Sequence, residues 1–165
     1  MTDEHTAGLT GGLTHVDASG AARMVDVSAK DTSARRAVAT GKVLVSAEVV
    51  AALRGDGVPK GDALAVARIA GIMGAKRTPD LIPLCHPIAI TGVTLDLEVA
   101  DDAVLIVATV KTTDRTGVEM EALTAVSVAG LAVIDMVKAL DPAAVITEVR
   151  VETKDGGKTG HWERP

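Results

Sequence analysis

The sequence predicts an α+β domain whose strands and helices follow the order β-α-β-β-α-β. Two segments have the apolar pattern of helices, and two strand-like segments lie between them. One further strand-like segment precedes the first helix, and another follows the second. This order is that of the ferredoxin-like split unit, an antiparallel sheet with its helices packed on one face. In chain order the six segments are 36–45, 62–77, 88–99, 104–112, 118–140 and 147–154.

The N-terminal residues are expected to stand apart from this domain. Residues 1–12 are polar, glycine-rich and without period, which predicts a disordered leader. The remainder, 13–165, has the size of a single domain. A short β-type run at Met24–Val27 precedes the valine-rich strand 36–45, and Ser46 is expected to cap a short inserted helix that ends at Gly55.

The first long helix is expected to start near Gly61–Asp62 and to end at Thr78–Pro79, because the residue before a proline is pushed out of the α region. Prolines 79, 83 and 87 then predict a stiff, irregular segment at Asp80–Pro87. This segment presents Leu84, Cys85 and His86 in a fixed conformation.

The strand pair carries the clearest alternation in the chain. Apolar residues alternate with polar ones over 93–99, while Ile88 and Ile90 lie in the opposite phase. Gly92, at the change of phase, predicts a β-bulge. Asp101–Asp102 form the turn, and both faces of 104–112 are largely apolar, which indicates a central or an interface strand.

Residues 118–140 form the strongest helical segment, apolar almost all round and rich in alanine and glycine. A helix that is apolar on every side is buried on every side. In so small a domain, this predicts burial against another subunit, and therefore an oligomer.

Composition excludes several classes of protein. The chain has no Phe or Tyr, one Trp and a net charge of −5, whereas RNA-binding sheets of this kind need stacking aromatics and a basic face. No run approaches the roughly 18 apolar residues of a membrane span. One cysteine and an acidic N-terminus without an apolar segment favour a soluble, cytoplasmic protein.

Candidate functional residues occur in two loops. Lys60, at the start of a helix, could contact a phosphate, or it could be a surface lysine beside a capping Asp62. His86 could donate to an anion or move a proton, and Cys85 is more often structural than chemical. A zinc site is not expected, because the chain has no second cysteine.

The helix 118–140 carries Glu119, Glu121, Asp135 and Lys138 in an otherwise apolar surface. Asp135 and Lys138 are three residues apart and can meet as an ion pair or as a coupled acid and base. Glu121 is roughly 21 Å from Asp135 along the axis. Either the ligand is long, or the two carboxylates serve one site from different subunits. The alternative is a solvated stripe without a catalytic role.

The C-terminal segment holds Lys154 and Lys158, either as electrostatic contacts for a ligand or as plain charges of a mobile tail. The Gly-Lys-Thr at 157–159 is not a phosphate-binding loop, because Glu152 stands where that motif requires glycine.

Eight stretches of the chain carry a resemblance to a known family: LTHVD at 13–17, MVDVSAK at 24–30, KGD at 60–62, ARIAGI at 67–72, GAKRTPDLIPLCHP at 74–87, TGVEMEALTA at 116–125, DMVKA at 135–139 and GGKTG at 156–160. Together they resemble the cyclic pyranopterin monophosphate synthase family, also called molybdenum cofactor biosynthesis protein C. The resemblance runs from Leu13 to Gly160.

The resemblance implies a ferredoxin-like fold, a hexamer built from dimers, and sites shared between subunits. It implies conversion of 3′,8-cyclo-7,8-dihydroguanosine 5′-triphosphate to the cyclic monophosphate with loss of diphosphate. It makes Asp135 the acid–base residue, Lys138 its cationic partner and Lys60 a second catalytic or phosphate-contacting cation. The substrate contacts that it implies are Leu84, Cys85, His86, Met120, Glu121, Glu119, Lys154 and Arg35.

The implied chemistry agrees with the residue types. A net-acidic protein must supply local cations to hold a triphosphate, and expulsion of diphosphate requires neutralised charge and a removed proton. The sequence requires no metal or other cofactor, although Mg²⁺ could accompany the triphosphate. A catalytically silent relative that keeps the pocket is the rival interpretation, which the intact Lys60, Asp135 and Lys138 argue against.

Overall fold

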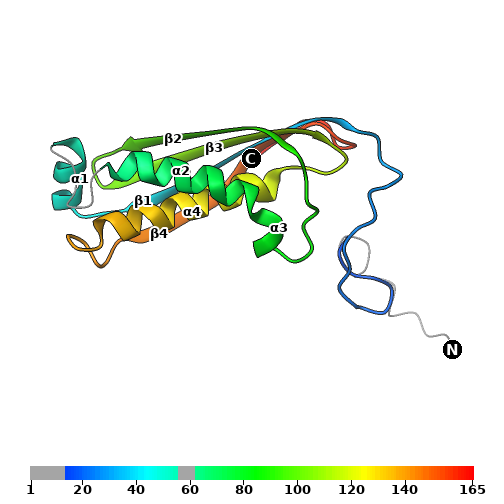
Figure 1. Cartoon of the computed structure of the whole chain (residues 1–165), viewed down its shortest axis with the longest axis horizontal. Helices are drawn as coiled ribbons and strands as arrows, with labels where there is room; N and C mark the ends of the chain where they lie inside the picture. The colour runs from blue at the N-terminus through cyan, green and yellow to red at the C-terminus, as the bar shows by residue number, and fades with distance from the viewer. Residues whose placement is uncertain (1–13, 56–61) are drawn as a thin grey trace.

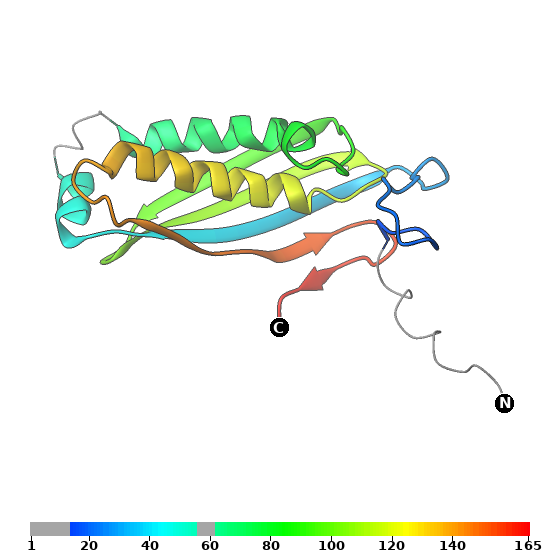
Figure 2. The ribbon, with the colours of Figure 1, turned by 90° about the horizontal axis from the view of Figure 1, so that it is seen from below.

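The computed structural model describes residues 14–55 and 62–165, so the predicted leader and Lys60 lie outside the described residues. The two long helices lie on one face of an antiparallel sheet (Figures 1 and 2). In chain order the elements are β1 (Ser33–Leu44), α1 (Ala47–Arg54), α2 (Ala63–Lys76), α3 (Thr78–Leu81), β2 (Ile90–Val99), β3 (Ala103–Asp114), α4 (Glu119–Val137), β4 (Val145–Asp155) and β5 (Trp162–Glu163).

The sheet has five strands in the order β2-β3-β1-β4-β5, and each neighbouring pair is antiparallel. The mixed architecture, the two long helices and the four long strands are as predicted. The short edge strand β5 was not predicted, and it pairs with the end of β4 through Thr153 and Lys154. It matters for the site, because it extends the sheet beside the first turn of α4 (Figure 2).

Predictions at two boundaries are confirmed in detail. The Ser46 hydroxyl accepts a hydrogen bond from the Val49 amide at 3.3 Å, and Asp62 accepts one from the Ala65 amide at 2.9 Å. Capping by these side chains satisfies amides that have no partner inside the helix. The bulge at Gly92 is present as a shift of register between Ile90 and Gly92.

Two local predictions are wrong. Met24–Val27 forms no strand, and the only bridge near it joins Val16 to Ala22 among the described residues. The segment 80–87 is not irregular throughout, because α3 continues to Leu81. Pro79 lies in the first turn of α3, where its missing N–H group costs nothing and its φ suits a helix. The break between α2 and α3 is therefore at Arg77.

Helix α4 is buried mainly within its own chain, which corrects the reason given for an oligomer. It packs on β1, β3 and β4 beneath it and on α2 beside it. The small residues allow this close approach: a Cβ atom on Gly71 would lie 2.8 Å from the Ala125 carbonyl oxygen, and one on Gly74 would lie 2.8 Å from the Val128 side chain. Among the described residues, α4 is the one helix long and apolar enough to cross a membrane, but here it is a core helix.

Candidate active site

A first pocket lies where the 84–86 loop meets the start of α4. Six of the predicted contact residues line it together, and its volume is about 320 Å³. We call it the carboxyl pocket, and its lining residues are His15, Leu84, Cys85, His86, Thr116, Gly117, Glu119, Met120 and Glu121. The stiff loop and the helix, which are 33 positions apart in sequence from His86 to Glu119, thus present their side chains to one space.

Glu121 is the buried charge of this pocket, with only 3% of its surface exposed. Burial raises the pKa of its carboxyl from an ordinary 4.5 to about 7, and the charge of Glu119 adds to the rise. Burial likewise raises the pKa of the Cys85 thiol, with a further contribution from Glu121. At neutral pH the pocket therefore holds a carboxyl group that can give or take a proton, beside a thiol that stays protonated.

His86 connects this pocket to the N-terminal segment. Its Nε2 donates to the Val25 carbonyl oxygen at 2.6 Å, because a carbonyl oxygen can only accept. This bond fixes the orientation of the ring. His15, from the same segment, lines the pocket as well. Sequence reasoning missed His15, although the LTHVD stretch contains it.

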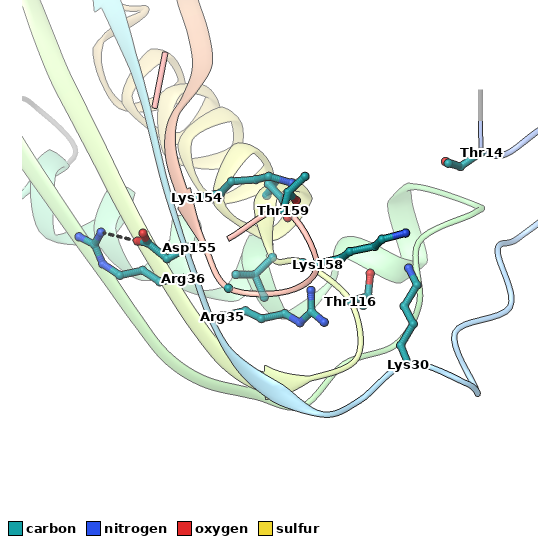
Figure 3. Close-up of a pocket in the computed structure, with 13 residues that line it drawn as sticks. Thr14, Lys30, Arg35, Arg36, Thr116, Lys154, Asp155, Lys158 and Thr159 are labelled. Atoms are coloured by element: carbon teal, nitrogen blue, oxygen red, sulfur yellow. Dashed lines mark hydrogen bonds and ion pairs between the residues drawn. The ribbon is translucent and has the colours of Figure 1, made fainter. Parts of the chain in front are cut away.

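A second pocket adjoins the first and is lined by cations (Figure 3). We call it the cationic pocket, of about 320 Å³, lined by Thr14, Lys30, Arg35, Arg36, Thr116, Gly117, Val118, Glu119, Lys154, Asp155, Gly156, Lys158 and Thr159. Its cations come from β1, β4, the N-terminal segment and the glycine-rich turn after β4. Arg36 extends away from the group and pairs with Asp155 at 3.6 Å.

The glycine-rich turn explains how these cations come together. Gly156 and Gly157 have φ angles of 91° and 72°, which favour glycine. A Cβ atom on Gly157 would overlap the Arg35 guanidinium. The Arg35 Nε donates to the Asp114 carbonyl oxygen at 2.8 Å, which holds the guanidinium beside the turn. Lys158, one of the possible electrostatic contacts named from the sequence, lines this pocket. Lys30 and Arg36 line it as well, and neither was singled out from the sequence.

The two pockets share Thr116, Gly117 and Glu119. Arg35, Lys154 and Glu119 of the predicted contacts line the cationic pocket, and the other five line the carboxyl pocket. An elongated ligand with an anionic end and a hydrogen-bonding ring would match this arrangement of charges.

Asp135 and Lys138 lie near the other end of α4 and line neither pocket. The Lys138 Nζ donates to Asp135 Oδ1 at 2.7 Å, and each side chain is 57% exposed. The predicted ion pair is therefore present, but 14 residues of helix, roughly 21 Å, separate Asp135 from Glu121 in one chain. Within the described ranges, no three His, Cys, Asp or Glu residues are grouped to hold a metal ion.

The Glu121→Gln variant is expected to be more stable than the parent above pH 7. The folded pKa of Glu121, about 7, exceeds its ordinary 4.5, so the native state keeps a proton that the unfolded chain releases. The contribution of Glu121 to the stability of the parent therefore falls as pH rises from 4.5 to 7 and stays lower above that window. Glutamine removes this contribution, roughly 3 kcal/mol by the size of the shift.

Urea unfolding of the parent and the variant across pH 4 to 8, at one protein concentration, measures the effect. Glu48→Gln, an acidic first-turn residue of α1, is the matched control and should follow the parent. Parallel curves for Glu121→Gln and the parent across the window would show that Glu121 is ionised in the native protein.

Comparison with known proteins identifies the family of this chain. Residues 24–157 match the MoaC family. Similar proteins named cyclic pyranopterin monophosphate synthase include one from Streptomyces avermitilis, 77% identical, over 92% of this chain and 89% of the relative. Another, from Nocardioides sp., is 73% identical over 93% of this chain and 96% of the relative. A protein of Mycobacterium tuberculosis, named cyclic pyranopterin monophosphate synthase 2, is 59% identical over 94% of this chain and 93% of the relative. The chain therefore belongs to the MoaC family.

Proposed function

We propose that this chain is a cyclic pyranopterin monophosphate synthase, a lyase of molybdenum cofactor biosynthesis. Its substrate is (8S)-3′,8-cyclo-7,8-dihydroguanosine 5′-triphosphate, and its products are cyclic pyranopterin monophosphate and diphosphate. The observation that carries the proposal is the junction of the cationic pocket with the carboxyl pocket. One pocket matches a triphosphate, and the other matches a guanine-derived ring.

The cationic pocket supports the phosphate half of this proposal. The protein has a net charge of −5, so its overall field does not attract a polyanion. The local field comes instead from four cations that line one small space: Lys30, Arg35, Lys154 and Lys158. When a ribose hydroxyl attacks the α-phosphorus, negative charge moves onto the departing diphosphate. Fixed cations stabilise that charge without reorganising.

The carboxyl pocket supports the ring half. Opening the imidazole ring of the guanine part needs several proton transfers. Glu121, whose pKa is raised to about 7, can act in either direction at neutral pH. His86 offers a second polar contact for the ring, held by its bond to Val25. Leu84, Cys85 and Met120 supply the remaining lining and offer apolar contacts to the ring.

We assign the main acid–base role to Asp135, with Lys138 as its cationic partner and Lys60 as a further catalytic cation. The 2.7 Å contact keeps a lysine proton beside a carboxylate. Because these residues are roughly 21 Å along the helix from Glu121, a site that includes both needs two chains. A neighbouring subunit would bring its Asp135 to the pockets described above.

An exposed apolar surface on the helices supports such an assembly. Its members lie on α2, α3 and α4, and each is at least a third exposed in the single chain: Val66, Ile69, Met73, Leu81, Met120 and Leu131. Exposed apolar side chains gathered on one set of helices are typical of protein–protein contacts. We propose that it forms the dimer contact of a dimer-based hexamer, whose subunits are ferredoxin-like with β5 as an added edge strand.

The protein is accordingly expected to be oligomeric, and Ile69→Lys should reduce its assembly. A charged lysine buried at an apolar contact costs several kcal/mol, whereas at an exposed site it costs little. Multi-angle light scattering at micromolar concentration would measure the mass. A parent species of 16.8 kDa would contradict the proposal. Ile69→Leu, which keeps the apolar surface, is the control and should assemble as the parent does.

Incubation with the cyclised nucleotide tests the function directly. Diphosphate release and pterin fluorescence after oxidation should appear together, in equal amounts. A protein that binds the nucleotide without releasing diphosphate would be a silent relative, which uses the pocket as a sensor or scaffold. We further propose that the enzyme is cytoplasmic, that it binds neither nucleic acid nor membranes, and that any Mg²⁺ arrives with the triphosphate.

A further inference from the structure

Glu119 lies at the junction of three pockets around the first turn of α4. It lines the cationic pocket, the carboxyl pocket and a third, apolar hollow that includes Val151 and Trp162. Its carboxylate accepts a hydrogen bond from the Lys154 Nζ at 2.9 Å. This is an unusual partner for an anion-binding lysine, since it places a negative charge where a phosphate is expected.

We propose that Glu119 is a positioning residue that acts through Lys154: it is a built-in counter-ion that competes with phosphate for this lysine and so promotes release of diphosphate. This inference rests on the proposed function. It goes beyond that function by giving Glu119 a role opposed to product binding, rather than a contact with substrate.

The local structure holds the carboxylate in this position. Glu119 is in the first turn of α4, where the helix dipole favours a negative charge. Gly117 leaves room for it, because a Cβ atom on Gly117 would overlap the Glu119 Oε2. The ion pair is two-thirds covered, with side-chain exposures of 33% for Lys154 and 28% for Glu119. Partial burial strengthens the pair, while the remaining access to water lets the carboxylate move aside.

The outcome of this competition for Lys154 changes during the reaction: the phosphates of the substrate prevail before cleavage, and Glu119 prevails after it. The triphosphate is covalently joined to a ring held in the carboxyl pocket, so its phosphates have a high effective concentration at Lys154 and can displace Glu119. Once the bond to the α-phosphorus is broken, diphosphate loses that tether. Glu119 remains tethered to the helix, so it regains Lys154 and weakens the hold on the leaving diphosphate.

Isothermal titration of the assembled enzyme with inorganic diphosphate, in metal-free buffer, tests this inference. Glu119→Gln should bind diphosphate about tenfold more tightly than the parent, since one competing charge has been removed. Glu48→Gln is the control, because it also removes an acidic residue from the first turn of a helix but lines none of the three pockets. It should bind as the parent does.

Two further variants separate competition for Lys154 from a general change of charge. Gly117→Ala keeps every charge, but its Cβ atom would displace the Glu119 carboxylate from its position beside Lys154. It should therefore also tighten diphosphate binding, by a smaller factor. In a Lys154→Met background, Glu119→Gln should give no gain, because the shared partner is missing. In turnover assays, Glu119→Gln should lower the inhibition constant of diphosphate.

The outcomes distinguish the inference from the function on which it rests. If the parent enzyme neither binds diphosphate nor releases it from the nucleotide, the proposed function is wrong. If the parent binds it and Glu119→Gln binds it equally or more weakly, Glu119 is not a competitor and this inference is overturned. An equal gain in the presence and absence of Lys154 would overturn it as well, since the effect would not act through that lysine.

Discussion

Replacing Asp135 with Asn should lower turnover at least about 100-fold, the usual contribution of one positioned acid or base. Asparagine keeps the shape of the side chain and can still accept a hydrogen bond from Lys138, but it cannot hold or release a proton. Because the Asp135–Lys138 pair is half exposed, its loss should change stability little. Diphosphate release under saturating substrate measures the effect on the chemical step.

A matched surface variant makes this result specific. Asp101 is another exposed carboxylate paired with a cation, Arg54, at 3.1 Å. Asp101→Asn should therefore retain parent turnover. The mass of the Asp135→Asn assembly must equal that of the parent, since loss of both activity and assembly would assign Asp135 a structural role. Near-normal turnover of an assembled Asp135→Asn enzyme would remove Asp135 from the mechanism.

Local rules predicted much of the fold, because its signals are local. Ser46 and Asp62 are caps whose chemistry is readable within one helical turn, and Gly92 marks the change of phase that becomes the bulge. The failures arise from tertiary context. Pro79 was read as the end of a helix, yet it begins α3. Strand β5 depends on pairing of Trp162 with Lys154, which no local pattern of two residues can reveal.

The site was predictable where neighbouring residues act together. The 84–86 loop and the first turn of α4 were both identified, and the structure brings them to one pocket. The cationic pocket was harder, because Lys30, Arg35 and Lys158 come from three separate segments and meet only through the fold. The apolar character of α4 suggested burial against another subunit, but it reflects packing on α2 and the sheet of the same chain. The exposed Ile69 and Met73 of α2 carry the stronger argument for an assembly.

A mixture of two inactive variants should regain activity if sites are shared between subunits. Glu121 and Asp135 lie roughly 21 Å apart along α4, so one pocket can use both only by taking them from different chains. In a mixed pair of Glu121→Gln and Asp135→Asn subunits, one site carries both lesions and the other carries neither. Random exchange in equal amounts should leave about a quarter of the sites intact, by the symmetry of the pair.

The restored activity should rise with the extent of subunit exchange, which native mass spectrometry can follow on the same samples. Each variant exchanged with itself provides the baseline and should remain inactive. A mixture of Asp135→Asn with Lys138→Met gives the sharper control: these residues are 2.7 Å apart in one chain, so every site of a mixed pair keeps one lesion. Full exchange without recovery in the first mixture would show that each site lies within one chain. Glu121 would then serve the fold, and Asp135 would act without it.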